Sequence, residues 1–191
     1  MDIDLEAVEH DLRRQFEFRL PAMVARQANL QTQPFIPDAF FAQASAECQR
    51  LFVEGHDYAC ILLTQAVAEG IARFLAEKNN VKVFANDHRA QINLLQHAPG
   101  PPAITPAAFS AFRKIRGKPC EDRNDFHHMN SNVEQSCAKL EQRAKQCIES
   151  LYLIEAEVFA FEYGNGGTLV LANPHYWPSA GANEVMVYVQ G

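Results

Sequence analysis

A chain of 191 residues can bury one hydrophobic core, and 48% hydrophobic with 21% charged residues is the composition of a soluble globular protein. The net charge of −6 argues against a protein that coats nucleic acid, and no apolar run approaches the roughly 20 residues of a membrane span. The acidic start MDIDLEAVEHDLRR lacks an apolar signal core, and five cysteines without a CxxC pair fit a reducing compartment. We therefore expect a cytoplasmic protein that spans no membrane and needs neither a bound metal nor a cofactor.

Three helices are predicted in the first 80 residues. The first covers residues 3–19 and ends at Pro21, because proline lacks an N–H and clashes with the preceding turn. The second opens at Pro37-Asp38 and stops near Gly55, and the third, residues 57–78, is apolar enough to be the core helix, with Asp57 as its cap. The apolar side chains of the first helix recur at helical spacing and form one stripe: Leu5, Val8, Leu12, Phe16 and Leu20.

Two shorter helices are predicted at residues 86–97 and 105–116, the second opened by Thr105-Pro106 as N-cap and first helical residue. Glycine and proline then break the chain, so a new element begins at about residue 119 and runs to about 155. The capping-box pattern Ser131-Asn-Val-Glu134 offers a competing start for that helix.

The last 35 residues change character. GNGG at 164–167 predicts a turn, and TLVLA and EVMVYV predict short strands, whereas VFAFEY is either a third strand or the end of the long helix. Tyr176-Trp177 either stack on a base or pack the loop down. The predicted fold is mainly α, a helical bundle with a small C-terminal β-hairpin appendage. Its expected parts are an N-terminal helix and linker (1–36), the bundle (37–156) and the β tail (157–191), within one compact domain.

The segment EDRNDFHHMN, residues 121–130, places one arginine, one asparagine and two histidines within eight positions. Residues 113–128 carry five positive and three negative side chains, a local charge of +2 on a body that is otherwise at −8. A phosphate-bearing ligand held at one place would explain this grouping, and a solvated basic helix end is the other interpretation.

Cleaving RNA without a metal requires a base for the 2′-hydroxyl proton, an acid for the leaving 5′-oxygen and a cation for the phosphorane. Histidine titrates near neutral pH and serves as base or acid, while arginine presents a bidentate fork to phosphate oxygens. Asn124 can hold either residue in position or bond a phosphate oxygen. Arg123 and His127 are four residues apart and share a helix face, whereas His128 lies about 140° round an ideal helix from Arg123.

Arg123-Asn124, three residues and then His128 resemble the R-N-x-x-x-H signature of HEPN domains, the higher eukaryote and prokaryote nucleotide-binding fold. The core helix HDYACILLTQAVAEGIARFLAEK, with Glu69 in its middle, is also similar to the first core helix of that family. The resemblance covers roughly residues 38–155. It implies a helical bundle with metal-independent ribonuclease activity, usually in a homodimer whose two motifs face one cleft. Many members of the family are toxins or antiviral defence effectors.

The resemblance selects His128 as the catalytic base, with Arg123 on the phosphate, Asn124 positioning both and His127 as a helper or a packing residue. Glu69 is either the partner that orients Arg123 or an exposed carboxylate. The surrounding cations either follow an RNA backbone or are solvated: Lys114, Arg116 and Lys118.

The expected partners are RNA, a second copy of the chain, and an antitoxin or defence-system protein. Two other functions stay open. One is a non-catalytic HEPN-like module that uses the same arginine and histidines to bind a nucleotide or a protein, and the other is a helical scaffold whose β tail mediates assembly.

Overall fold

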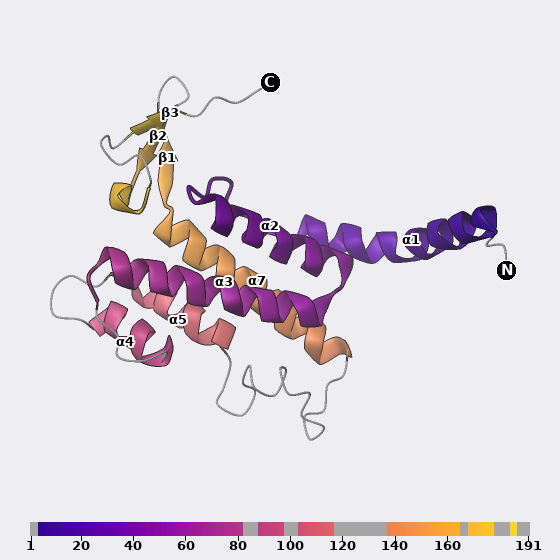
Figure 1. Ribbon diagram of the computed structural model, residues 1–191, viewed down its shortest axis with the longest axis horizontal. Helices are drawn as coiled ribbons and strands as arrows, with labels where there is room; N and C mark the ends of the chain where they lie inside the picture. Colours follow the sequence, from indigo (N-terminus) through magenta and orange to yellow (C-terminus); the bar gives the residue numbers. More distant parts are fainter. Residues whose placement is uncertain are drawn as a thin grey trace.

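The computed structural model describes residues 4–81, 88–97, 103–116, 137–164, 168–177 and 184–186 (Figure 1). Its helices are α1 (Leu5–Ala28), α2 (Ala39–Glu54), α3 (Asp57–Lys78), α4 (His88–His97), α5 (Pro106–Arg116) and α7 (Cys137–Val158). Its strands are β1 (Phe161–Tyr163), β2 (Thr168–Leu171) and β3 (Glu184–Met186), with a short 3₁₀ turn, η2 (Pro174–Tyr176), between the last two.

The fold is mainly α with a small antiparallel sheet, which confirms the predicted class. The sheet has three strands in the order β1-β2-β3 rather than the two of a hairpin, with Phe161 opposite Leu171 and Thr168 opposite Met186. The additional strand is β1, which lies in VFAFEY. This segment is divided between two elements: α7 ends at Val158 and β1 begins at Phe161. Residues 165–167 of the predicted turn and 187–189 of the last strand lie outside the described residues.

The core helix is α3, at the centre of the bundle, where it packs against α2, α5 and α7 (Figure 1). Its inward face carries Ile61, Ile71 and Leu75, all of them fully buried. By length and composition alone α3 could cross a membrane, whereas in this fold more than half of its most apolar stretch is buried against other parts of the chain.

Local capping residues set several helix boundaries where the sequence predicts them. Asp38 accepts hydrogen bonds from two backbone N–H groups in the first turn of α2, and α2 ends at Gly55 in the left-handed conformation, with φ of 81°. Thr105 caps α5 by accepting from the N–H groups of Ala107 and Ala108. The prediction that Asp57 caps α3 is wrong, because its carboxylate binds the side chain of Arg26 instead.

The prediction that Pro21 ends the first helix is also wrong, because α1 continues through it to Ala28. A proline inside a helix costs roughly 3 kcal/mol. Contacts on both sides of Pro21 offset that cost: the guanidinium of Arg19 donates to the carbonyl of Glu54, and that of Arg26 to the carbonyl of Phe52. Tertiary contacts therefore decide the length of α1, against the local propensity.

The β tail is packed onto the bundle through its aromatic residues. Tyr176 and Trp177 are buried, and the hydroxyl of Tyr176 accepts a hydrogen bond of 2.9 Å from the side chain of Asn79 at the end of α3. The Tyr176 ring also lies 5.9 Å from that of Phe74. The packing interpretation of this pair is confirmed, because buried rings offer no face on which a base could stack.

Candidate nucleic-acid interface

The predicted catalytic residues lie in the connection between α5 and α7. Arg123, Asn124, His127 and His128 fall outside the described residues, as does Lys118, so their mutual geometry stays a prediction. The structure does describe where this connection leaves α5, after Arg116, and where it joins α7, at Cys137.

The end of α5 is held by side chains from two other helices. The carbonyl of Ile115 accepts hydrogen bonds from Arg143 of α7, at 2.6 Å, and from Gln65 of α3, at 3.3 Å. The other terminal nitrogen of Arg143 donates to the carbonyl of Lys114, also at 2.6 Å. The last carbonyls of a helix have no partner within it and carry partial negative charge, so a guanidinium stabilises them. Sequence reasoning missed Gln65 and Arg143; the signal for Gln65 was an amide on an apolar helix face.

The last turn of α5 carries three cations and α5 contains no acidic residue. Arg113 and Lys114 are exposed, as contact with a phosphate backbone requires, and the guanidinium of Arg113 lies 5.7 Å from the centre of the Phe109 ring. Arg116 is half-buried, and one of its terminal nitrogens is sealed from solvent with no hydrogen-bond partner within the described ranges. Lys114 is therefore more accessible to a large ligand than Arg116.

Glu69 lies half-buried on α3, one turn beyond Gln65 and so on the same side of the helix. This places the carboxylate on the helix that holds the end of α5 through Gln65. Its expected partner Arg123 lies outside the described residues, so the pairing remains a prediction.

Three cysteines of the described bundle are buried free thiols: Cys48, Cys60 and Cys147. Burial raises the pKa of Cys48 and Cys60 to about 12 and that of Cys147 to about 11. Since the thiolate is the reactive form, these three are poor nucleophiles in the folded state. In the part of the chain that the structure describes, no three side chains of the histidine, cysteine or acidic type gather closely enough to hold a metal ion.

Iodoacetamide at about pH 8 is expected to leave Cys48, Cys60 and Cys147 unmodified in the native protein and to modify all three in denaturant. The reason is the same burial that raises their pKa values. Peptide mass mapping of both samples measures the occupancy at each cysteine. Complete modification of any of the three under native conditions would contradict the packing described for α2, α3 and α7.

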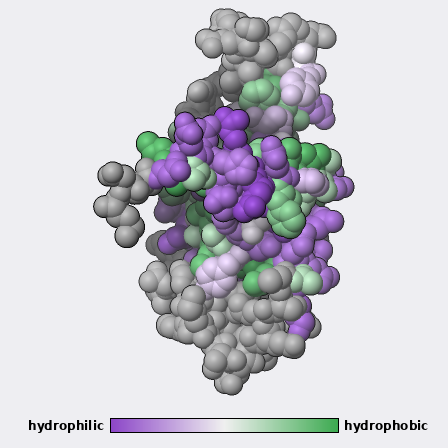
Figure 2. Space-filling model, turned by 90° about the vertical axis from the view of Figure 1, so that its right-hand side faces the viewer, coloured by the Kyte–Doolittle hydropathy of each residue, from purple (hydrophilic) through white to green (hydrophobic). Residues whose placement is uncertain are grey.

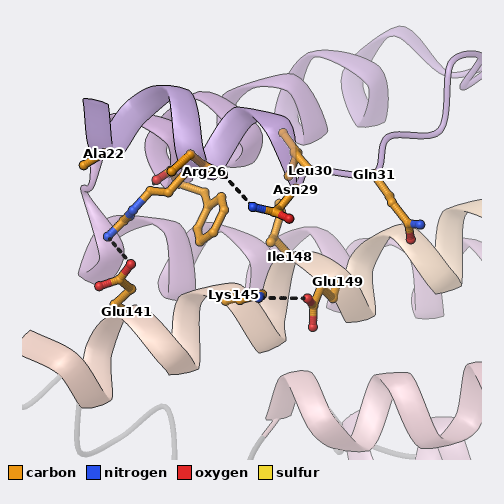
Figure 3. A pocket seen from close by; sticks show the side chains of 11 residues that line it. Ala22, Arg26, Asn29, Leu30, Gln31, Glu141, Lys145, Ile148 and Glu149 are labelled. Atoms are coloured by element: carbon orange, nitrogen blue, oxygen red, sulfur yellow. Dashed lines mark hydrogen bonds and ion pairs between the residues drawn. The ribbon is translucent and has the colours of Figure 1, made fainter. Parts of the chain in front are cut away.

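One pocket, of about 350 Å³, lies between the second half of α1 and α7 (Figure 3). Arg26 enters it from α1, facing Glu141 of α7 at 3.3 Å, while Lys145 and Glu149 pair at 3.9 Å along its edge. Ala22 and Ile148 supply apolar surface. Because Arg26 is already bonded to Asp57, Glu141 and the carbonyl of Phe52, the pocket offers a ligand no free cation at this position.

No family model matches the chain, and neither the curated proteins nor the solved structures compared with it provide a match.

Proposed function

We propose that this protein is a metal-independent endoribonuclease of the HEPN type that acts as a toxin or antiviral defence effector. The observation that carries the proposal is the pattern Arg123-Asn124-x-x-x-His128, placed between two helices of a mainly α-helical body. Arginine and histidine at this spacing supply the charge and the proton transfer that phosphodiester cleavage needs in the absence of a metal.

In the proposed reaction Arg123 binds the non-bridging oxygens of the scissile phosphate. His128 takes the proton from the 2′-hydroxyl, whose oxygen then attacks phosphorus, and the bond from phosphorus to the 5′-oxygen breaks as that oxygen receives a proton. Asn124 positions the two, and His127 is the second candidate for proton transfer. The products carry a 2′,3′-cyclic phosphate, or the 3′-phosphate formed from it, and a 5′-hydroxyl.

The α5 end supports this function electrostatically. Arg113 and Lys114 are exposed, and the chain enters the motif-bearing segment directly after Arg116. A polynucleotide backbone lying along these cations would be led to Arg123, on a protein whose net charge of −6 repels it elsewhere. The bonds from Gln65 and Arg143 to the carbonyl of Ile115 hold the end of α5, which carries these cations, on the bundle.

The motif of a single copy contains one arginine and two histidines. A two-fold axis through the cleft would bring the motifs of two copies together, with two arginines and four histidines in all. We therefore propose that the active form is a homodimer. Because an unrestrained ribonuclease harms its own cell, a neutralising antitoxin or a defence-system activator belongs to the same proposal.

The purified chain, incubated with RNA in EDTA, is expected to cleave it, and Arg123→Ala or His128→Ala is expected to lower the rate at least about 100-fold. Cleavage products resolved on a denaturing gel, with end-group analysis, measure both rate and chemistry. Arg50→Ala is the matched control, since Arg50 is an exposed arginine on α2 that pairs only with neighbouring carboxylates in the described ranges. It should cleave at the wild-type rate, and all variants should share the wild-type melting temperature.

Cleavage that needs an added divalent metal, or that survives both substitutions, would refute the mechanism. If no RNA is cut but a nucleotide raises the melting temperature and Arg123→Ala removes that shift, the chain is the non-catalytic binding module instead.

A further inference from the structure

Helix α1 exposes the apolar stripe that its sequence predicts. It projects beyond the bundle (Figure 1), and none of its described side chains is buried. Viewed toward this end of the molecule, apolar side chains lie among the hydrophilic ones (Figure 2). The stripe residues are between 41% and 75% exposed: Leu5, Val8, Leu12, Phe16 and Leu20. An apolar stripe at helical spacing usually faces a core, and this one faces solvent.

The stripe is nearly symmetric about Leu12. Val8 and Phe16 lie four residues before and after it, and Leu5 and Leu20 lie seven before and eight after. If a second α1 runs antiparallel across the first, with Leu12 at the crossing, Val8 of each copy meets Phe16 of the other. A two-fold axis requires a self-complementary surface of this kind.

The charges of α1 are arranged in the same self-complementary way. Residues 4–11 carry four carboxylates and no lysine or arginine, and residues 13–26 carry four arginines and one carboxylate. Antiparallel pairing places the acidic half of each copy against the basic half of the other, whereas parallel pairing places like charges together. Arg13 and Arg14 are each 74% exposed and pair only with Glu9 and Asp11 in the described ranges, so they can also reach carboxylates of a second copy.

We propose that two copies of this chain associate through α1, as an antiparallel helix pair with its two-fold axis at Leu12. The surface that covers the exposed stripe is thus the same stripe of a second copy. Each stripe covers the other. Each α1 is attached to its own bundle through Arg19 and Arg26, so the two bundles lie on either side of the helix pair. This association does not depend on ribonuclease activity.

Sedimentation of the full chain over a range of concentrations tests the association. The mass is expected to rise from 21.4 kDa toward twice that value, and Leu12→Glu is expected to hold it at 21.4 kDa at every concentration. Phe18→Glu is the matched control, because Phe18 is 87% exposed, lies off the stripe on the other side of α1, and should leave the dimer unchanged. At concentrations where the wild type is monomeric, both variants should have its melting temperature, since neither side chain is buried in the single chain.

Disulfide trapping tests the orientation. Val8→Cys mixed with Phe16→Cys should give a cross-linked peptide joining positions 8 and 16, and neither variant alone should cross-link through its new cysteine. A wild-type chain that stays monomeric, a dimer that survives Leu12→Glu, or an 8-to-8 cross-link would overturn the proposal. A dimer that survives Leu12→Glu and still cleaves RNA would leave the proposed function intact while removing this mode of pairing.

Discussion

Arg26→Ala is expected to lower the free energy of unfolding by about 3 kcal/mol, because it leaves a largely buried carboxylate without its partner. The Arg26 guanidinium lies 2.6 Å and 3.2 Å from the two oxygens of Asp57, a bidentate pair whose side chains are only 13% and 15% exposed. The hydrogen bond to Asp57 raises the pKa of Arg26 above its ordinary value, so the guanidinium remains charged. Urea unfolding of the wild type and the variant measures the difference.

The same guanidinium holds four helices together. It belongs to α1, donates to the carbonyl of Phe52 near the end of α2, binds Asp57 at the start of α3 and lies 3.3 Å from Glu141 of α7. Its Cζ atom also lies 5.1 Å from the centre of the Phe52 ring. Arg26→Lys keeps the positive charge but cannot bind both oxygens of Asp57 as the guanidinium does. Its free energy of unfolding should therefore lie between those of Arg26→Ala and the wild type.

A control on the same helix separates this buried pair from ordinary surface charge. Arg13 pairs with Glu9 at 2.6 Å, but both side chains are mostly exposed, so Arg13→Ala should cost no more than about 0.5 kcal/mol. Asp57→Ala combined with Arg26→Ala should cost less than the sum of the two single changes, because each already breaks the same pair. Additive costs would show that Arg26 and Asp57 stabilise the fold independently.

The elements that the sequence predicts well are those with local signals. Asp38, Gly55 and Thr105 satisfy helix ends through neighbouring backbone groups, and such short-range chemistry is legible in the sequence. Pro21 shows the limit of local reasoning, because the contacts of Arg19 and Arg26 that keep α1 helical involve residues 26 to 35 positions away. Whether VFAFEY contains a strand could not be predicted for a similar reason, because the segment fits a helix or a strand until its partner strand is known. The strand in it is β1.

In the candidate site, too, local chemistry could be predicted from the sequence and long-range contacts could not. The sequence alone indicates which residues have the chemistry to cut RNA, because arginine, asparagine and histidine at close spacing need no long-range information. The contacts that hold the end of α5 could not be predicted, since Arg143 lies 28 residues from Ile115 and Gln65 lies 50 residues away. Glu155 of α7 gave no signal either, because it is buried and its carboxylate accepts a hydrogen bond from Ser45 of α2, 110 residues away.

Glu155→Gln is expected to change the pH dependence of stability by about 3 kcal/mol between pH 4.5 and about pH 8. Glu155 of α7 is buried, with one carboxylate oxygen accepting from the hydroxyl of Ser45 at 3.1 Å and the other without a partner within the described ranges. Burial raises its pKa from 4.5 to about 7, and the bond from Ser45 opposes that rise only in part. The folded chain therefore keeps a proton that the unfolded chain has released.

Well below pH 4.5 the carboxyl is protonated in both states and contributes no pH dependence. Between 4.5 and about 7 the unfolded state loses its proton first, so wild-type stability falls as the pH rises, and above about 7 the penalty is constant. Glutamine cannot ionise, so the free energy of unfolding of the variant minus that of the wild type should grow across this window. Any fixed cost of burying the new amide cancels in that comparison.

Urea unfolding of both proteins at several pH values measures the growing difference, and Glu149→Gln supplies the control, because Glu149 lies on the same helix but is mostly exposed. The Glu149 variant should follow the wild type at a constant offset. A constant offset for Glu155→Gln as well would mean that this carboxyl reaches water or a cation in the folded protein, which contradicts the burial that Ser45 and the α2–α7 contact impose. A growing difference would instead identify Glu155 as a group that makes the bundle more stable in mild acid than at neutral pH.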